Sequence, residues 1–168
     1  HVVDLEVPGS HDRFGVFDIV YCYGTLYHLK NPSQSIEDLS KACGDTLLLE
    51  TCVNGKDNGD INLLQEDQSS YNQSYTGLGC WPGRDWIMAE LRKYFPYVYI
   101  TATQPDYPDF ELEWPVTGDT GRNARAVFVA SRRSLNLPAL LITCPTHQTK
   151  IEPVISAQES SSLGACHD

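Results

Sequence analysis

Two apolar runs joined by an amphipathic segment constrain the fold of this chain most. Residues 17–22 and 46–53 are rich in β-branched, aliphatic and aromatic side chains, a pattern typical of strands buried on both faces. Between them, Pro32 and Ser33 give a helix start, apolar residues recur at helical spacing, and Gly44 ends the helix. This strand, helix and strand predict a βαβ unit with parallel strands and a right-handed crossover.

The rest of the chain predicts one more helix and a strand pair. We expect the helix over residues 83–95 and strands over 97–102 and 125–131, paired antiparallel at a sheet edge because no helix fits between them. Residues 2–5 are interpreted as the end of a strand. The polar, aromatic segment 54–83 is long for a connection and favours a lid or binding loop. The fold class predicted is α/β, a mostly parallel sheet with a C-terminal antiparallel hairpin.

Composition and charge narrow the class of protein. The 168 residues suit one domain, predicted over 1–145, while the Gln-, Glu- and Ser-rich residues 146–168 are expected to be a disordered tail. A net charge of -10 disfavours nucleic acid and anionic membranes as partners. The sequence has no bilayer-length apolar run and no signal peptide, so we expect a cytoplasmic protein. The six cysteines form no C-x-x-C pair, and we expect them to be reduced. The histidines are scattered, which predicts no metal site.

The turn that follows the first apolar run is the candidate ligand site, because ligands of open parallel sheets lie beyond the carboxyl ends of the strands. His28 stands in this turn and is the candidate general base; the alternative is a histidine that only hydrogen-bonds its own turn. Tyr23 and Tyr27 offer aromatic faces to a cationic ligand, or pack as ordinary aromatics.

Residues 17–29, FDIVYCYGTLYHL, followed by Pro32, resemble the fourth-strand motif of class I S-adenosylmethionine-dependent methyltransferases, "FDxVxxxGxLYHL…P". The resemblance continues in order through residues 48–51, the WPGRDW string at 81–86, residues 94–98 and the closing strand at 125–132. It implies a partial Rossmann-like methyltransferase fold, the C-terminal part from the third strand onward. The expected sheet order is the family's fourth, fifth, seventh and sixth strands, with an exposed edge at residues 17–22.

The resemblance also implies a cofactor, S-adenosylmethionine, and site residues. The glycine-rich motif after the family's first strand is absent from this sequence, as is the acidic residue after its second strand. The residues that match cofactor-binding positions are Asp4, Leu5, Tyr23, Gly24 and Tyr27. Those expected to bind substrate are Glu50, Tyr71, Tyr75, Trp81 and Arg84, although a surface-exposed Glu50 and a solvated Arg84 are the alternatives.

Three functions remain open at this point. The first is methyl transfer to an oxygen or nitrogen atom of a small molecule, with upstream sequence needed for activity. The second is a non-catalytic binding or assembly module that forms a homodimer through the exposed edge at residues 17–22. The third is a tRNA-modifying methyltransferase, because wobble-uridine enzymes share the Leu-Tyr-His turn, but the net charge of -10 argues against an RNA substrate.

Overall fold

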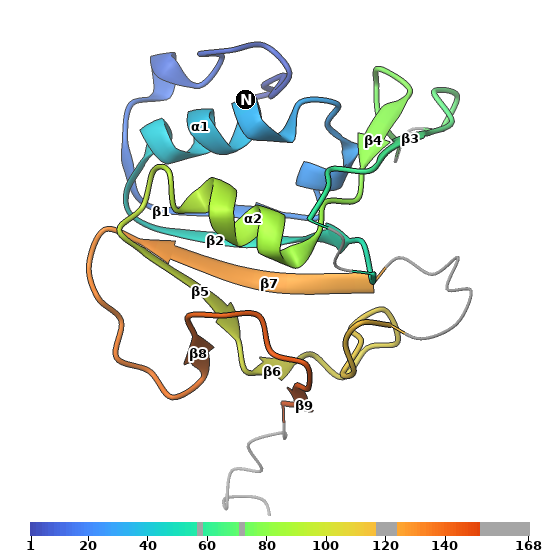
Figure 1. Cartoon of the computed structure of the whole chain (residues 1–168). Helices are drawn as coiled ribbons and strands as arrows, with labels where there is room; N and C mark the ends of the chain where they lie inside the picture. Colours follow the sequence, from blue (N-terminus) through green and yellow to red (C-terminus); the bar gives the residue numbers. More distant parts are fainter. Residues whose placement is uncertain (57–58, 71–72, 117–123, 152–168) are drawn as a thin grey trace, which may run out of the picture.

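A computed structural model describes residues 1–56, 59–70, 73–116 and 124–151 of the chain. A single mixed sheet forms its centre, and both helices lie on one face of that sheet (Figure 1). The elements, in chain order, are η1 (Asp12–Phe14), β1 (Phe17–Tyr23), η2 (Leu26–His28), α1 (Pro32–Ala42), β2 (Cys43–Val53), β3 (Leu63–Gln65), β4 (Leu78–Cys80), α2 (Arg84–Leu91), β5 (Tyr97–Thr101), β6 (Thr103–Gln104), β7 (Ala124–Ser131), β8 (Leu140–Leu141) and β9 (Thr149–Lys150).

The order of the main sheet is β1-β2-β7-β5-β8. β1 and β2 pair in parallel, and β7 pairs antiparallel with both β2 and β5. β1, β2 and β5 therefore run in one direction and β7 in the other, which confirms the predicted fold class and the predicted order of the four long strands. β1 is the terminal strand of this sheet, as expected.

Sequence patterns at both ends of α1 explain its limits. Asn31 caps the helix by accepting the backbone N–H of Gln34 at 3.4 Å, and Pro32 occupies the first turn, where a missing N–H costs nothing. Ile36 and Leu39 point into the core that α1 shares with β2 and α2. The helix ends where β2 begins, at Cys43.

One hydrophobic core joins the helices to the sheet. The side chains that fill it from the sheet include Leu47, Leu49, Ile100 and Phe128, each 0 to 1 % exposed. α2 contributes its own apolar side chains to the same cluster, namely Ile87, Met88 and Leu91. The βα arrangement is therefore held by burial on the helical face of the sheet.

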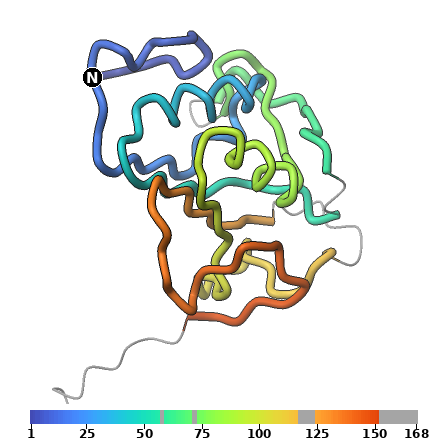
Figure 2. The backbone as a smooth tube through the Cα atoms, turned by 60° about the vertical axis from the view of Figure 1, so that its left-hand side comes forward, coloured from blue at the N-terminus to red at the C-terminus, as the bar shows by residue number. Residues whose placement is uncertain are grey.

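β1 is not buried on both faces, contrary to the prediction. Phe17, Ile19, Tyr21 and Tyr23 alternate along the strand and are 47 to 65 % exposed, whereas Cys22 on the other face is 5 % exposed. The reason is that both helices cover the same face. Residues 132–151 lie mainly at the β5 side of the sheet, where β8 pairs with β5 at the edge opposite to β1 (Figure 2).

Residues 2–5 form no strand, so that prediction was wrong as well. They run in extended and turn conformations, and the N–H of Val7 donates to the carbonyl of Asp4 at 3.2 Å. The physical reason is pairing: the described chain places no strand beside them, and a short apolar run does not form a strand alone.

The boundary predicted at residue 146 also differs from the structure. Gln148 is 1 % exposed, donates to the carbonyl of Thr101 at 2.6 Å and accepts the indole N–H of Trp114 at 2.9 Å. β9 then pairs with β6. The Gln148 side chain packs inside the domain because Thr101 and Trp114 supply a matching acceptor and donor, which a hydropathy pattern does not reveal. Residues 152–168 of the expected tail lie outside the described residues.

Candidate functional site

The turn after β1 is anchored to the end of β2. Gly24 adopts a φ of 65°, a left-handed conformation that favours glycine, and so redirects the chain at the strand's end. Its N–H donates to both the carbonyl oxygen of Glu50, at 3.3 Å, and the carboxylate of the same residue, at 2.9 Å. Leu26, fully buried, fixes the start of η2. The local sequence thus places η2, and His28 at its end, beyond the carboxyl ends of β1 and β2.

His28 is paired with a buried carboxylate. Its Nδ1 lies 2.8 Å from Oε2 of Glu66, whose side chain is 4 % exposed, while the imidazole is 20 % exposed. Glu66 Oε2 also accepts the backbone N–H of Ser74 at 2.5 Å. A carboxylate can only accept here, so it favours the tautomer with hydrogen on Nδ1 and leaves the Nε2 lone pair free. This is the arrangement that makes a histidine a general base.

A glycine makes room for this pair. A Cβ at Gly79 on β4 would lie 2.5 Å from the carbonyl oxygen of Tyr27 and would overlap the Glu66 carboxylate. The hairpin of β3 and β4 therefore packs tightly on η2. The segment expected to be a lid is, in its described part, this hairpin, and it delivers Glu66 to His28.

His28 of this pair lines a cavity of about 500 Å³, called here the first pocket. It lies between the N-terminal loop, η2 and the loop that leads to β4. Its described lining residues are Asp4, Glu6, Gly24, Tyr27, His28, Leu29, Gln73, Ser74, Tyr75 and Thr76. The pocket combines carboxylates, an aromatic wall and the histidine.

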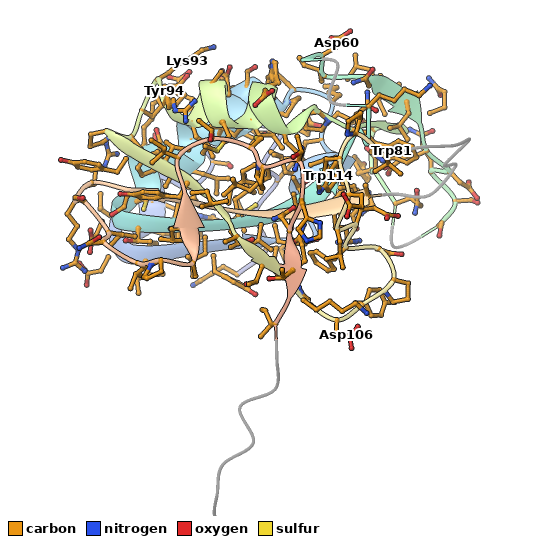
Figure 3. The ribbon with its side chains drawn as sticks, turned by 60° about the horizontal axis from the view of Figure 1, so that its bottom comes forward. Asp60, Trp81, Lys93, Tyr94, Asp106 and Trp114 are labelled. Carbon is orange, nitrogen blue, oxygen red and sulfur yellow. The ribbon has the colours of Figure 1, made fainter. Side chains whose placement is uncertain are left out.

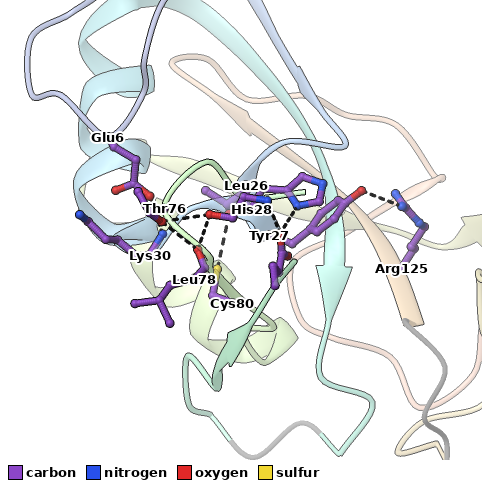
Figure 4. Close-up of polar contacts among 11 residues, drawn as sticks. Glu6, Leu26, Tyr27, His28, Lys30, Thr76, Leu78, Cys80 and Arg125 are labelled. Carbon is purple, nitrogen blue, oxygen red and sulfur yellow. Dashed lines mark hydrogen bonds and ion pairs between the residues drawn. The ribbon is translucent and has the colours of Figure 1, made fainter. Parts of the chain in front are cut away.

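Arg125 closes the other side of Tyr27. Its guanidinium donates from Nη1 to Glu50 at 2.6 Å and from Nη2 to the hydroxyl of Tyr27 at 3.1 Å. Figure 4 shows Tyr27 between His28 and Arg125. Burial alone lowers the pKa of Arg125, but the hydrogen bonds to Glu50 and Tyr27 raise it overall, so the group stays charged. Glu50 is 1 % exposed and its carboxylate is held by Arg125 and Gly24.

The cysteines near the site are unsuited to nucleophilic chemistry. Burial raises the pKa of Cys22 to about 11 and the pKa values of Cys52 and Cys80 to about 12. Thiols with such values stay protonated at neutral pH. Cys22, Cys43, Cys52 and Cys80 form no disulfide, and no three His, Cys, Asp or Glu side chains among the described residues are placed to hold a metal ion.

The structure brings five of the predicted site residues together. Asp4, Gly24, Tyr27, His28 and Tyr75 all line the first pocket, although they come from three separate segments of the chain. Tyr75 is 92 % exposed and stands at its rim. These five residues therefore surround one cavity, whose role as a site remains a prediction.

The other described candidates lie elsewhere. Leu5 packs against the core and its carbonyl accepts the hydroxyl of Ser35 at 3.4 Å. Trp81, directly after β4, hydrogen-bonds Asn62, which precedes β3, at the end of the molecule away from Tyr94 (Figure 3). Tyr23 lines a second cavity, and Tyr71 lies outside the described residues.

Glu50 and Arg84 differ from their solvent-exposed alternatives. Glu50 is buried in the pair with Arg125. Arg84 is 2 % exposed, donates to the carbonyl of Pro145 at 3.0 Å, and has its Cζ 3.8 Å from the ring centroid of Trp114. Arg84 therefore ties α2 to the C-terminal segment rather than facing solvent.

Sequence reasoning missed Glu66 and Arg125 as site residues. Glu66 is 38 positions from His28 and Arg125 is 98 positions from Tyr27. Glu66 stands in a polar segment without periodicity, and Arg125 was interpreted only as the first residue of a strand. Only the tertiary fold joins them to the turn, although an arginine at the start of a buried strand is a signal that it needs a buried partner.

None of the helices in the described residues has the length and apolarity needed to cross a membrane.

No protein-family model and no curated protein sequence matches the chain. Solved structures of similar fold include the N-terminal domain of EvdMO1 with SAH bound, with a TM-score of 0.60 and 18 % identity over 79 % of this chain and 53 % of that one.

The same domain in the presence of SAH and D-fucose has a TM-score of 0.54 and 19 % identity, over 73 % of this chain and 50 % of that one. A SAM-dependent methyltransferase of Thermotoga maritima, a possible histamine N-methyltransferase, has a TM-score of 0.40 and 15 % identity over 71 % of this chain and 57 % of that one. The chain spans about half the length of each. Its architecture is therefore a Rossmann-like α/β fold of the kind seen in the SAH-bound domain of EvdMO1.

Proposed function

We propose that this chain is part of an S-adenosylmethionine-dependent methyltransferase that acts on an oxygen or nitrogen atom of a small molecule. The observation that carries the proposal is the His28–Glu66 pair on the first pocket, 2.8 Å between Nδ1 and Oε2, at the carboxyl ends of β1 and β2. In an α/β sheet of this kind that is the place where ligands bind.

The residues of the first pocket fit such a cofactor. Its volume of about 500 Å³ lies within the usual range for small-molecule sites, about 300–1,000 Å³. Asp4 and Glu6 supply acceptors for amino and hydroxyl groups, and Glu6 Oε2 is buried without a hydrogen-bond partner among the described residues. Nothing lies within 4 Å of a Cβ built on Gly24, so the backbone there is accessible. The cofactor supplies an electrophilic methyl group when it is bound.

His28 then acts as the base. Its Nε2 takes the proton from the O–H or N–H of the acceptor as that atom becomes a nucleophile, a role that contributes roughly 10²–10⁴-fold to rate. Glu66 holds the ring through Nδ1 and stabilises the imidazolium that forms. Tyr27, whose ring centroid lies 4.0 Å from that of His28, limits the orientation of the imidazole.

Two measurements test the proposal. Calorimetric titration with SAH should show binding to this chain, weakened by Asp4→Asn, and absence of binding contradicts a cofactor site in these 168 residues. In the complete protein that contains this chain, His28→Asn and Glu66→Gln should lower the rate of methyl transfer more than SAH affinity.

The matched control is His147→Asn. His147 also pairs with a carboxylate, Glu113, at 2.7 Å, but that pair is exposed and outside the first pocket. An unchanged rate in His28→Asn, or an equal loss in His147→Asn, removes His28 from the mechanism.

The alternative function is a binding or assembly module. The observation in its favour is β1, a terminal strand whose exposed face carries Ile19 and Tyr21 at 63 and 65 % exposure. Unpaired strand edges template pairing with another chain. Under this alternative the chain forms a homodimer and does not bind SAH, so the titration above separates the two functions.

A further inference from the structure

A second cavity, of about 440 Å³, is lined by Arg125, which hydrogen-bonds the hydroxyl of Tyr27 in the wall of the first pocket. Six residues line it: Tyr23, Pro105, Tyr107, Asp109, Phe110 and Arg125. The two cavities are neighbours, because Tyr23 lines one, the adjacent Gly24 lines the other, and Arg125 hydrogen-bonds the Tyr27 hydroxyl at 3.1 Å.

We infer that this second pocket binds a neutral ring that bears hydroxyl groups, and that this ring is the methyl acceptor. The assignment of the ring as acceptor rests on the proposed methyltransferase function; the binding of the ring does not. Three observations support the binding of such a ring: the aromatic lining of the pocket, the balanced charge of the Arg125 guanidinium and the position of the Asp109 carboxylate.

The aromatic residues provide flat apolar surface. Phe110 is buried, whereas Tyr107 and Tyr23 are 60 and 47 % exposed. Burial and the charge of Glu50 raise the pKa of Tyr23, so its hydroxyl stays protonated and can donate as well as accept. Aromatic faces with a polar tip favour ring-shaped ligands, through stacking on the face and a hydrogen bond at the edge.

The charged groups favour a neutral ligand. The charge of Arg125 is already balanced by Glu50, at 2.6 Å, and its Nε lies 3.6 Å from Oδ2 of Asp109. An anionic ligand would therefore meet a guanidinium whose charge two carboxylates already balance. A cationic ligand would find only Asp109 to pair with, because Glu50 is 1 % exposed and already paired with Arg125.

A hydroxyl group suits the same pair of side chains. A guanidinium has five N–H donors, and Arg125 directs three of them toward Glu50, Tyr27 and Asp109, so two have no partner among the described residues. The side chain of Asp109 is 41 % exposed and offers acceptor oxygens. One hydroxyl, or two neighbouring hydroxyls, can donate to Asp109 and accept from Arg125 at the same time.

The experiment compares probes by ligand-observed NMR, without cofactor. Methyl α-glucoside and 4-methylphenol represent the sugar and phenol sources of the same chemistry, and phenyl phosphate and benzylammonium are charged analogues. We expect at least one neutral probe to bind at millimolar concentration, and whichever binds identifies the source. Asp109→Asn or Tyr107→Ala should weaken it about five- to tenfold, the loss expected for one hydrogen bond or ring contact.

Matched controls are Asp106→Asn and Tyr97→Ala, which alter an exposed aspartate and a tyrosine outside the second pocket and should leave binding unchanged. Three results overturn the inference. A charged analogue binds more tightly than the neutral probes, or neither neutral probe binds, or Asp109→Asn and Tyr107→Ala bind the neutral probe as tightly as the unmutated chain does. The SAH titration is independent: ring binding without SAH binding contradicts a cofactor site in these 168 residues and leaves the acceptor role without support, but the ring site stands.

Discussion

The substitution Gly79→Ala tests the packing that brings Glu66 to His28. The added methyl group would lie 2.5 Å from the carbonyl oxygen of Tyr27, a backbone atom that cannot rotate away, and would displace the Glu66 carboxylate. Overpacking of this kind costs about 1–3 kcal/mol, and loss of hydrogen bonds to a charged group about 1.5–3 kcal/mol more. We therefore expect the free energy of unfolding to fall by roughly 2.5–6 kcal/mol, a large share of the ~5–15 kcal/mol of a typical domain.

Urea unfolding followed by circular dichroism measures this loss, and for a chain of this size each kcal/mol also lowers Tm by roughly 2–4 °C. Gly44→Ala is the matched control, because its methyl group would meet the Val16 side chain at 3.1 Å and no backbone atom closer than 3.4 Å. We expect that control to lose under about 1 kcal/mol.

A double-mutant cycle separates the two costs. In a Glu66→Ala background the carboxylate is gone. Gly79→Ala should then lower the free energy of unfolding by less than it does in the wild type, and the difference should be about the 1.5–3 kcal/mol assigned to the hydrogen bonds of Glu66. If Gly79→Ala costs no more than Gly44→Ala, the close packing of β4 on η2 described here is refuted.

Three further outcomes follow. Arg125→Met should lower the free energy of unfolding, measured by urea unfolding, by about 3–5 kcal/mol, because it leaves Glu50 buried without its partner. The control Arg133→Met, at an exposed arginine, should lower it by about 0–1 kcal/mol. Equal losses in the two variants contradict the role of burial. Burial raises the pKa of Cys52 from 9.0 to about 12, so only the unfolded thiol ionises as pH rises above about 9. Cys52 alone should then lower the free energy of unfolding by up to ~1.4 kcal/mol per pH unit, in addition to the same effect at Cys22 and Cys80. Urea unfolding between about pH 8 and pH 10.5 measures this slope, which Cys52→Ala should reduce. If the chain forms a homodimer, Ile19→Lys on β1 should reduce its sedimentation coefficient to that of a monomer, while Lys30→Glu, outside the sheet, should not.

Local patterns predicted the helices and the four long strands well. α1 was expected from Pro32 and Gly44, and the structure has it at Pro32–Ala42, because capping and helical periodicity act within the segment itself. The sheet order followed from the resemblance rather than from periodicity.

Features that depend on distant partners were not predictable. The exposed side of β1 reflects where both helices lie, and Gln148 is buried because Trp114 and Thr101 meet its amide. At the site, the turn from Tyr23 to His28 was recognised, but Glu66 was not, because its contact with the imidazole depends on how the β3–β4 hairpin folds back. Side chains whose partners are far apart in sequence leave no local signal.

The central position of β7 has a consequence for how the domain forms during synthesis. β7 lies between β2 and β5, and the partners of β5 in the main sheet, β7 and β8, both follow it in the chain. A nascent chain that has emerged only as far as α2 and β5 therefore has β1 paired with β2 but leaves β5 without its partners β7 and β8. Closing the sheet requires contacts of long sequence separation, which are slow to form. We expect the domain to become protease-resistant only after residue 131 has left the ribosome.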